Sequence, residues 1–139
     1  MSISFLIIAA GTPIAAAHDV RIDHQGGATQ VSYSARADVK TRTIGSSSPT
    51  RMDTRRCRWL ADVVIERSPR GLPHLTRVVS RDQRLSGSVP GACTGKDRMI
   101  DREIAAREDE VRSHLVAVAE KDSTLLLAEI NAAGQLASN

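Results

Sequence analysis

Residues 31–43 read VSYSARADVKTRT, a stretch in which small or apolar residues alternate with polar and charged ones. A period of two places the two sets on opposite faces of a β-strand, so this stretch predicts a half-buried strand. The same alternation returns at residues 57–65, where Cys57, Trp59 and Ile65 share one phase. Two such strands in succession favour an antiparallel sheet with one face in the core.

Weaker strand and turn signals surround these two strands. The turns are marked by glycine, proline and serine. In chain order we expect a short strand at 19–24, a turn at 25–28, a loop at 44–54, a turn at 68–73, and two weaker strands at 74–81 and 84–89. The expected sheet is therefore an antiparallel meander of four or five strands.

The pattern changes from residue 97 onward, where apolar residues recur every three or four positions. This spacing predicts an amphipathic helix over residues 97–120. Asp122 or Ser123 is expected to cap a second helix that ends near Gly134. The predicted fold class is α+β, with one or two C-terminal helices packed on one face of the sheet. The expected domain is 18–139, β-rich over 18–90 and helical over 97–133.

The N-terminal stretch, residues 1–17, has no charged side chain and ends in Ala15-Ala16-Ala17. This ending suits signal peptidase, so we predict a signal peptide that is cleaved before His18. Gly11 and Pro13 interrupt the apolar run well short of the ~20 residues that a membrane span needs, so no transmembrane anchor is expected after processing. The lack of Lys or Arg in this stretch leaves a misassigned start or a buried N-terminal strand as the alternative.

The chain has two cysteines, Cys57 and Cys93. Export exposes thiols to an oxidising compartment, so we predict that they form a disulfide in a periplasmic or secreted protein. After residue 17 the aromatic residues are Tyr33 and Trp59, so small aliphatic residues must build the core. A cross-link over this loop would contribute ~3–4 kcal/mol in the chain-entropy model. Two free core thiols are the alternative.

Basic charge is concentrated in the predicted sheet. Residues 36–84 contain twelve Lys or Arg and five Asp or Glu, whereas residues 97–129 contain five bases and nine acids. If the two long strands are neighbours, their polar faces form one basic patch. Guanidinium groups bind phosphate and carboxylate through paired hydrogen bonds, so the patch is a candidate anion-binding site. Its members are Arg36, Lys40, Arg42, Arg56 and Arg58.

Two observations favour a non-functional explanation of this patch. Arginine outnumbers lysine sixteen to three across the whole chain, which suggests a GC-rich coding bias. Asp38, Asp62 and Glu66 share the same face and could neutralise the patch through cross-strand pairs. Nucleic acid is not expected as a partner, because the face has no aromatic platform for bases. The expected partner is a protein or an anionic component of the cell envelope.

The histidines suggest two further sites. Cleavage before His18 would place its imidazole beside a free α-amino group, a pair that chelates copper if His74 or His114 supplies another ligand. We expect no cofactor. Arg107 and His114 lie at the edge of the apolar stripe of the predicted helix and form a candidate pocket. The alternative is that the arginine stem covers the core while its charged end stays in water.

No catalytic grouping is evident in the sequence. Residues 90–97 lack the first glycine and the Ser or Thr of a phosphate-binding loop, and Val89 occupies the position of the serine in a nucleophile elbow. We therefore expect a non-enzymatic binding protein of the envelope. One alternative is a periplasmic metal-binding protein or hydrolase that uses His18, His74 or His114. Another is a structural subunit that forms homo-oligomers by docking its basic sheet on an acidic helix.

Overall fold

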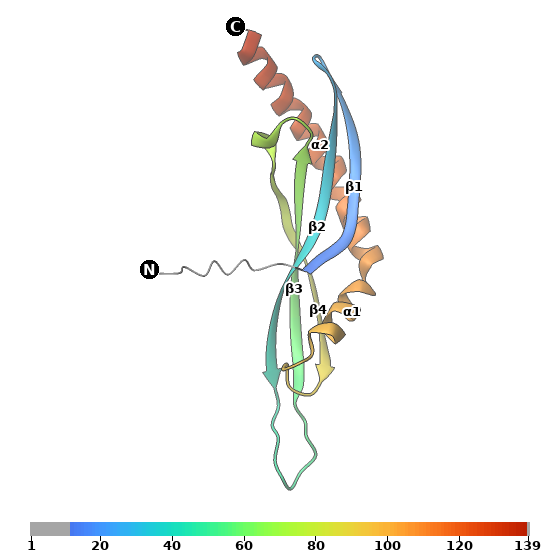
Figure 1. Cartoon of the computed structure of the whole chain (residues 1–139), viewed down its shortest axis with the longest axis vertical. Coiled ribbons are helices and arrows are strands. Elements are labelled where there is room, and N and C mark those ends of the chain that lie inside the picture. The colour runs from blue at the N-terminus through green and yellow to red at the C-terminus, as the bar shows by residue number, and fades with distance from the viewer. Residues whose placement is uncertain (1–11, 139) are drawn as a thin grey trace, which may run out of the picture.

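The computed structural model describes the backbone of residues 12–138 and the side chains of residues 16–137. Four strands form one sheet in the order β1-β2-β3-β4, and each pairs antiparallel with the next along the chain (Figure 1). The elements are β1 (Thr12–His24), β2 (Gly27–Ile44), β3 (Arg56–Pro69), η1 (Pro73–Leu75), β4 (Arg77–Pro90), α1 (Asp97–Ala105) and α2 (Glu108–Ser138). The predicted α+β meander is confirmed.

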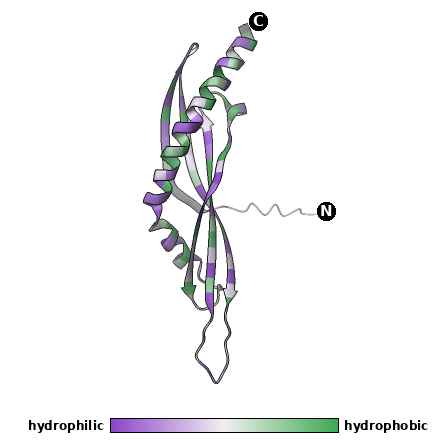
Figure 2. Cartoon of the chain, turned by 180° about the vertical axis from the view of Figure 1, so that it is seen from behind, coloured by the Kyte–Doolittle hydropathy of each residue, from purple (hydrophilic) through white to green (hydrophobic). Residues whose placement is uncertain are grey.

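The two central strands, β2 and β3, follow the alternation that predicted them. Their register pairs Tyr33 with Arg67, Ala37 with Val63 and Thr43 with Cys57 on the core face. The core-facing positions of both strands are buried along most of their length, while the intervening positions are mostly charged or polar. Figure 2 shows this change of hydropathy as bands along the strands.

The long helix α2 crosses one face of the sheet and packs mainly on β1, with further contacts to β2 and β4 (Figure 1). Its core-facing stripe recurs every three or four residues, as expected for one side of an α-helix. The stripe consists of Val111, Leu115, Ala119, Asp122, Leu126 and Ile130. A carboxylate therefore lies in the middle of an otherwise apolar stripe.

The predicted helix boundaries are wrong at the break and at the end. The break between the helices falls at Ala106 and Arg107, and α2 runs without interruption through Asp122 and Ser123. It also continues past Gly134, the expected end, to Ser138. Asp122 does not cap a helix, because its side chain bonds buried groups on the sheet instead. Residues 74–90 also differ from the expectation, since His74 lies in η1 and the two weak strands are one strand, β4, with an irregular register.

The beginning of β1 lies earlier than predicted. Residues 1–11, most of the predicted signal peptide, lie outside the described residues. Residues 12–17 belong to β1, where Ala16 pairs with Ala35 and is buried. Cleavage before His18 would therefore remove the first part of β1, and the signal peptide stays a prediction.

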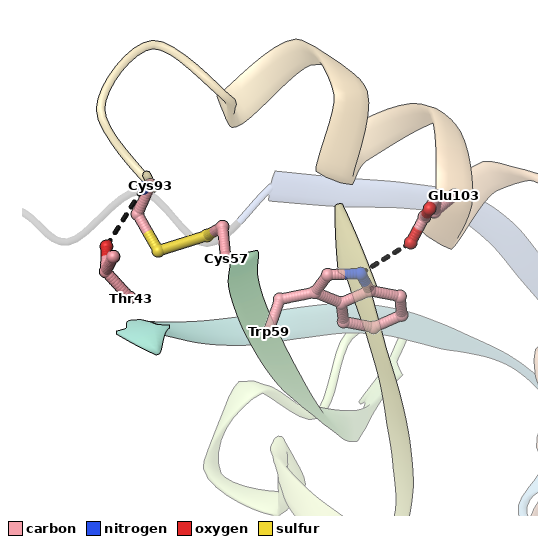
Figure 3. The surroundings of a disulfide bond; sticks show 5 residues. All are labelled: Thr43, Cys57, Trp59, Cys93 and Glu103. Atoms are coloured by element: carbon pink, nitrogen blue, oxygen red, sulfur yellow. Dashed lines mark hydrogen bonds between the residues drawn. A yellow bond between two sulfur atoms is a disulfide. The ribbon is translucent and has the colours of Figure 1, made fainter. Parts of the chain in front are cut away.

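A disulfide joins Cys57 on β3 to Cys93 in the loop that leads to α1, as predicted (Figure 3). The Cys93 backbone N–H donates to Thr43 Oγ1 at 3.0 Å, which ties the same loop to β2. The indole Nε1 of Trp59 donates to Glu103 Oε2 at 2.6 Å (Figure 3). These contacts fix α1 against the end of the sheet where β2 and β3 approach their connecting loop.

Candidate anion-binding site

The outer face of the sheet is the face turned away from the helices, and it carries four of the predicted basic residues close together. Lys40 and Arg42 on β2, and Arg56 and Arg58 on β3, alternate with core-facing residues. Arg42 pairs directly with Arg58 across the two strands. Directly opposed residues start ~5 Å apart at Cβ, so the two arginine stems leave the sheet side by side.

A hollow of about 500 Å³ lies over this part of β2, β3 and β4. Half-buried Leu60 and Ile44 contribute apolar surface, and Leu60 pairs with Ser86 on β4. The residues that line the hollow from outer-face positions are Lys40, Arg42, Ile44, Arg58, Leu60, Ser86 and Ser88. The hollow therefore combines cations with hydroxyl groups and apolar surface.

The acids of the outer face are engaged elsewhere. Arg36 NH1 lies 3.4 Å from Glu66 Oε2, and its Nε lies 3.8 Å from Asp38 Oδ1. Asp62 Oδ1 accepts a hydrogen bond from Arg84 Nε at 2.8 Å. The neutralisation expected from these acids thus reaches Arg36 and leaves the other four members of the predicted patch.

None of the ion pairs among the described residues involves Lys40, Arg42, Arg56 or Arg58. Arg56 has a neutral partner, because its Nε and NH2 donate to Ser88 Oγ at 3.2 and 3.0 Å. These four positive charges are consequently available to an external anion.

The loop that joins β2 to β3 contains another arginine, Arg55, which is already engaged. Its guanidinium donates to both carboxylate oxygens of Asp53, with NH2 2.9 Å from Oδ2. These hydrogen bonds lower the pKa of Asp53 to about 2. Arg55 therefore adds little free charge to the neighbouring site.

The hydrogen-bond donors of this site suit the binding of anionic oxygens. Arginine and lysine offer hydrogen-bond donors and no acceptors at neutral pH. The hollow has two serines, yet no histidine or carboxylate lines it among the described residues. The arrangement can hold phosphate or carboxylate oxygens, and it has no group positioned to activate a serine.

The structure gives the predicted pair Arg107 and His114 different surroundings. Arg107 donates to the backbone oxygen of Ser86 on β4 and to Glu110, so it bridges the helix to the edge of the sheet. His114 lies farther along α2 and lines a cleft with residues of β4. The guanidinium has two local partners in this position, which fits the expectation that it closes over the core.

His114 does lie near a serine, and no sequence pattern had suggested this contact. Its Nε2 is 3.4 Å from Ser80 Oγ, which also accepts the backbone N–H of Asp82. Among the described residues no carboxylate hydrogen-bonds the other ring nitrogen, and Asp122 in the same cleft bonds other groups. A serine hydrolase needs a base that is itself oriented by a third group. This pair lacks that group, and Ser80 is only 8% exposed.

The histidines of the metal hypothesis lie in different places. His18 pairs with Tyr33 in the middle of β1, His74 lies in η1, and His114 lies on α2. In the part of the chain that the structure describes, no three His, Cys, Asp or Glu residues cluster in a way that could hold a metal ion. A copper site at His18 would depend on a new N-terminus, which the described chain does not have.

A buried polar network is the feature that sequence reasoning missed. Arg67 is fully buried on the core face of β3, and its NH1 donates to both oxygens of Asp122 at 3.0 and 3.1 Å. Its NH2 donates to Glu129 at 2.7 Å, and the Tyr33 hydroxyl donates to Asp122 at 2.8 Å. Burial and the bond to Asp122 raise the pKa of Tyr33 well above its ordinary value. The network holds α2 on the sheet.

Comparison of the chain with protein-family models, with curated proteins and with solved structures found no match. The class of protein is therefore the one that the fold defines: a four-stranded antiparallel meander covered by C-terminal helices and cross-linked by one disulfide. The described helices include none with the length and apolar character needed to span a membrane.

Proposed function

We propose that this protein is a non-enzymatic binding protein that holds an anionic component of the cell envelope on the outer face of its sheet. The observation that carries the proposal is the direct pairing of Arg42 with Arg58, beside Lys40 and Arg56, with no acid of the described residues in an ion pair with any of them. Like charges directly opposite each other destabilise a sheet. The presence of two opposed arginines on the sheet is explained if a negative group binds between them.

The chemistry of the hollow suits phosphate or carboxylate groups. Each guanidinium presents a planar fork of N–H donors that matches a pair of anionic oxygens. Ser86 and Ser88 add hydroxyl donors, and Leu60 and Ile44 add a small apolar surface. This combination favours an anionic group that belongs to a partly apolar molecule.

A periplasmic or secreted location belongs to the same proposal. The predicted signal peptide supports it, as does the disulfide between Cys57 and Cys93, because disulfides persist mainly in oxidising compartments. Candidate partners in that setting are phosphate-bearing lipids, anionic polymers and acidic proteins.

Self-association through an acidic helix is less well supported. Two of the acids at the start of α2 already have partners within the helical segment, since Glu108 pairs with Arg112 and Glu110 with Arg107. This pairing reduces the negative charge that a basic sheet of another copy would meet. Light scattering at low and high salt separates the two functions, because head-to-tail docking of charged faces weakens as salt screens them.

The test measures binding of the purified protein to vesicles of phosphatidylglycerol, to vesicles of phosphatidylcholine and to soluble polyglutamate. The double variant Arg42→Glu/Arg58→Glu is expected to bind the anionic targets about tenfold more weakly or worse, because both opposed cations are reversed. The matched control is Arg98→Glu/Arg102→Glu, which makes the same change in net charge on exposed positions of α1. Equal binding of the two double variants would refute the proposal.

A single substitution separates loss of the site from loss of the fold. Arg58→Glu places a carboxylate opposite Arg42 and turns a repulsive cross-strand pair into an attractive one, a gain of about 1 kcal/mol. The melting temperature should rise by roughly 3–5 °C at low salt and by less at high salt. Anion binding should fall in the same variant. The Arg58→Gln variant should lie between wild type and Arg58→Glu in both melting temperature and anion binding. Weaker binding together with lower stability would indicate a damaged fold instead.

A further inference from the structure

A second cleft lies at the end of the molecule opposite the disulfide. It is enclosed by the turn between β1 and β2, by η1 and by the C-terminal part of α2, which come together at one end in Figure 1. Its volume is about 470 Å³, within the range of pockets that bind small molecules. It shares no lining residue with the hollow on the outer face of the sheet, which Lys40, Arg42 and Arg58 line.

The inner surface of this cleft is largely apolar. Leu72 and Leu75, on the segment that carries η1, are half-buried, and Ile130 on α2 is buried. These three side chains come from separate parts of the chain and contact the same space. They would bury the apolar body of a ligand, which is the main source of affinity in such pockets.

One buried acceptor in the lining has no partner. Asn131 lines the cleft, and its Oδ1 is shielded from solvent without a hydrogen bond to any described residue. Nearly all buried polar atoms in folded proteins are hydrogen-bonded, so an exception calls for an explanation. An N–H or O–H group of a bound molecule would supply the missing donor.

His24, one of the two histidines that line the cleft, cannot supply this donor. The Gly26 backbone N–H donates to His24 Nδ1 at 3.2 Å, so this nitrogen carries no proton in the neutral ring. The proton therefore lies on Nε2, which donates to Thr29 Oγ1 at 2.8 Å. Both ring nitrogens of His24 are engaged. Because Asn131 Oδ1 is shielded from solvent, a ligand donor would reach it once the amide turns towards the cleft.

A cation stands beside the cleft. Arg70 lines it and is exposed, and it belongs to none of the ion pairs among the described residues. No acidic side chain lines the same cleft in the described part of the chain. The charge of the lining therefore favours a ligand with an acidic group.

We propose that this cleft binds a small amphiphilic acid. Its apolar body packs on Leu72, Leu75 and Ile130, one N–H or O–H group donates to Asn131 Oδ1, and its acidic group pairs with Arg70. The proposal is independent of anion binding on the outer face of the sheet.

Two fluorescent probes that differ in an acidic group test the proposed role of Arg70. Anilinonaphthalene sulfonate has an apolar body, one N–H donor and a sulfonate, whereas N-phenylnaphthylamine has the same kind of body and donor without the charge. Both should bind the folded protein saturably. Arg70→Gln should weaken the sulfonate about fivefold or more and leave the uncharged probe unchanged, because only the former pairs with a guanidinium. Arg98→Gln is the control for the loss of one exposed cation.

Two further variants test the position of binding. Ala133→Phe, at an exposed lining position of α2, should fill the cleft and abolish binding of both probes. Asn131→Leu should weaken both about fivefold and raise the melting temperature, since it removes an unsatisfied buried acceptor. If Ala133→Phe changes the emission of Trp59 or the circular dichroism, its fold is disturbed. The binding data for Asn131→Leu and Arg70→Gln then decide whether the probes bind in this cleft.

Any of four results would overturn the proposal. Three of them are non-saturable binding of both probes, equal weakening of both probes by Arg70→Gln, and full binding to a folded Ala133→Phe variant. Loss of the uncharged probe in Arg42→Glu/Arg58→Glu would also overturn it, because that result would place the probe on the outer face of the sheet.

Discussion

Replacing Asp122 with alanine would remove the central acceptor of the buried network between α2 and the sheet. The carboxylate accepts two hydrogen bonds from Arg67 NH1 and one from the hydroxyl of Tyr33, with lengths of 2.8–3.1 Å. Asp122 is 6% exposed, and both of its partners are fully buried. Water therefore has little access to the groups that the substitution would leave unpaired.

The magnitude follows from what remains around Arg67. Removing one partner of a buried ion pair typically destabilises a protein by ~3–5 kcal/mol. Glu129 still accepts from Arg67 NH2 at 2.7 Å and the Leu75 backbone oxygen from Nε at 3.0 Å, so part of the charge stays compensated. We therefore expect a loss of about 3 kcal/mol in the free energy of unfolding, which lowers the melting temperature of a domain of this size by roughly 10–15 °C.

Urea and thermal unfolding, followed by circular dichroism and by the emission of the single tryptophan, would measure this loss. The double variant Arg67→Met/Asp122→Leu should recover most of it, because it removes both buried charges and fills the space with apolar atoms. Asp122→Asn should fall between wild type and Asp122→Ala. A loss below about 1 kcal/mol, or a double variant less stable than Asp122→Ala, would refute the assignment of a coupled buried pair.

Two other predictions concern the aromatic residues of the core. Burial and the bond to Asp122 raise the pKa of Tyr33, so the folded protein keeps a proton that the unfolded chain releases near pH ~10. The free energy of unfolding should therefore fall above that pH by up to ~1.4 kcal/mol per pH unit. The near-ultraviolet absorbance of this single tyrosine should titrate at higher pH in the folded protein than in the unfolded protein. The Tyr33→Phe variant should lack this fall in stability. A Cβ on Gly87 would meet the Trp59 ring at 2.6–2.7 Å, so Gly87→Ala should destabilise by ~1–3 kcal/mol and shift tryptophan emission, whereas Gly134→Ala, which meets nothing within 4 Å, should not.

The long strands were accessible from sequence because alternation is a local signal, and the disulfide was accessible because the chain has two cysteines and no others. The alternation around Tyr33 and Trp59 reports which side chains face the core, and the structure confirms it. The helix break was not accessible in the same way. Aspartate is a residue type that often caps helices, so the sequence favoured a cap at Asp122. In the structure a buried carboxylate is stabilised in mid-helix because Arg67, 55 positions earlier, supplies a buried cation.

The candidate site was predictable only in part. Neighbouring strands were enough to bring Arg42 and Arg58 together once their register was known. The pattern did not show that Arg36 is neutralised by Glu66 while the other four cations are not, because that depends on side-chain reach across two strands. The apolar cleft beside Asn131 had no sequence signal, since three distant segments enclose it.

The sequence by itself determined the class of fold, the orientation of the two central strands and the pairing of the cysteines. Each of these follows from residue periodicity or from having two cysteines and no others. Tertiary structure alone decided which charges are free, where the helix breaks and where clefts open. The physical reason is that ion pairing and burial depend on distances between groups far apart in the chain, whereas periodicity depends on the geometry of adjacent residues.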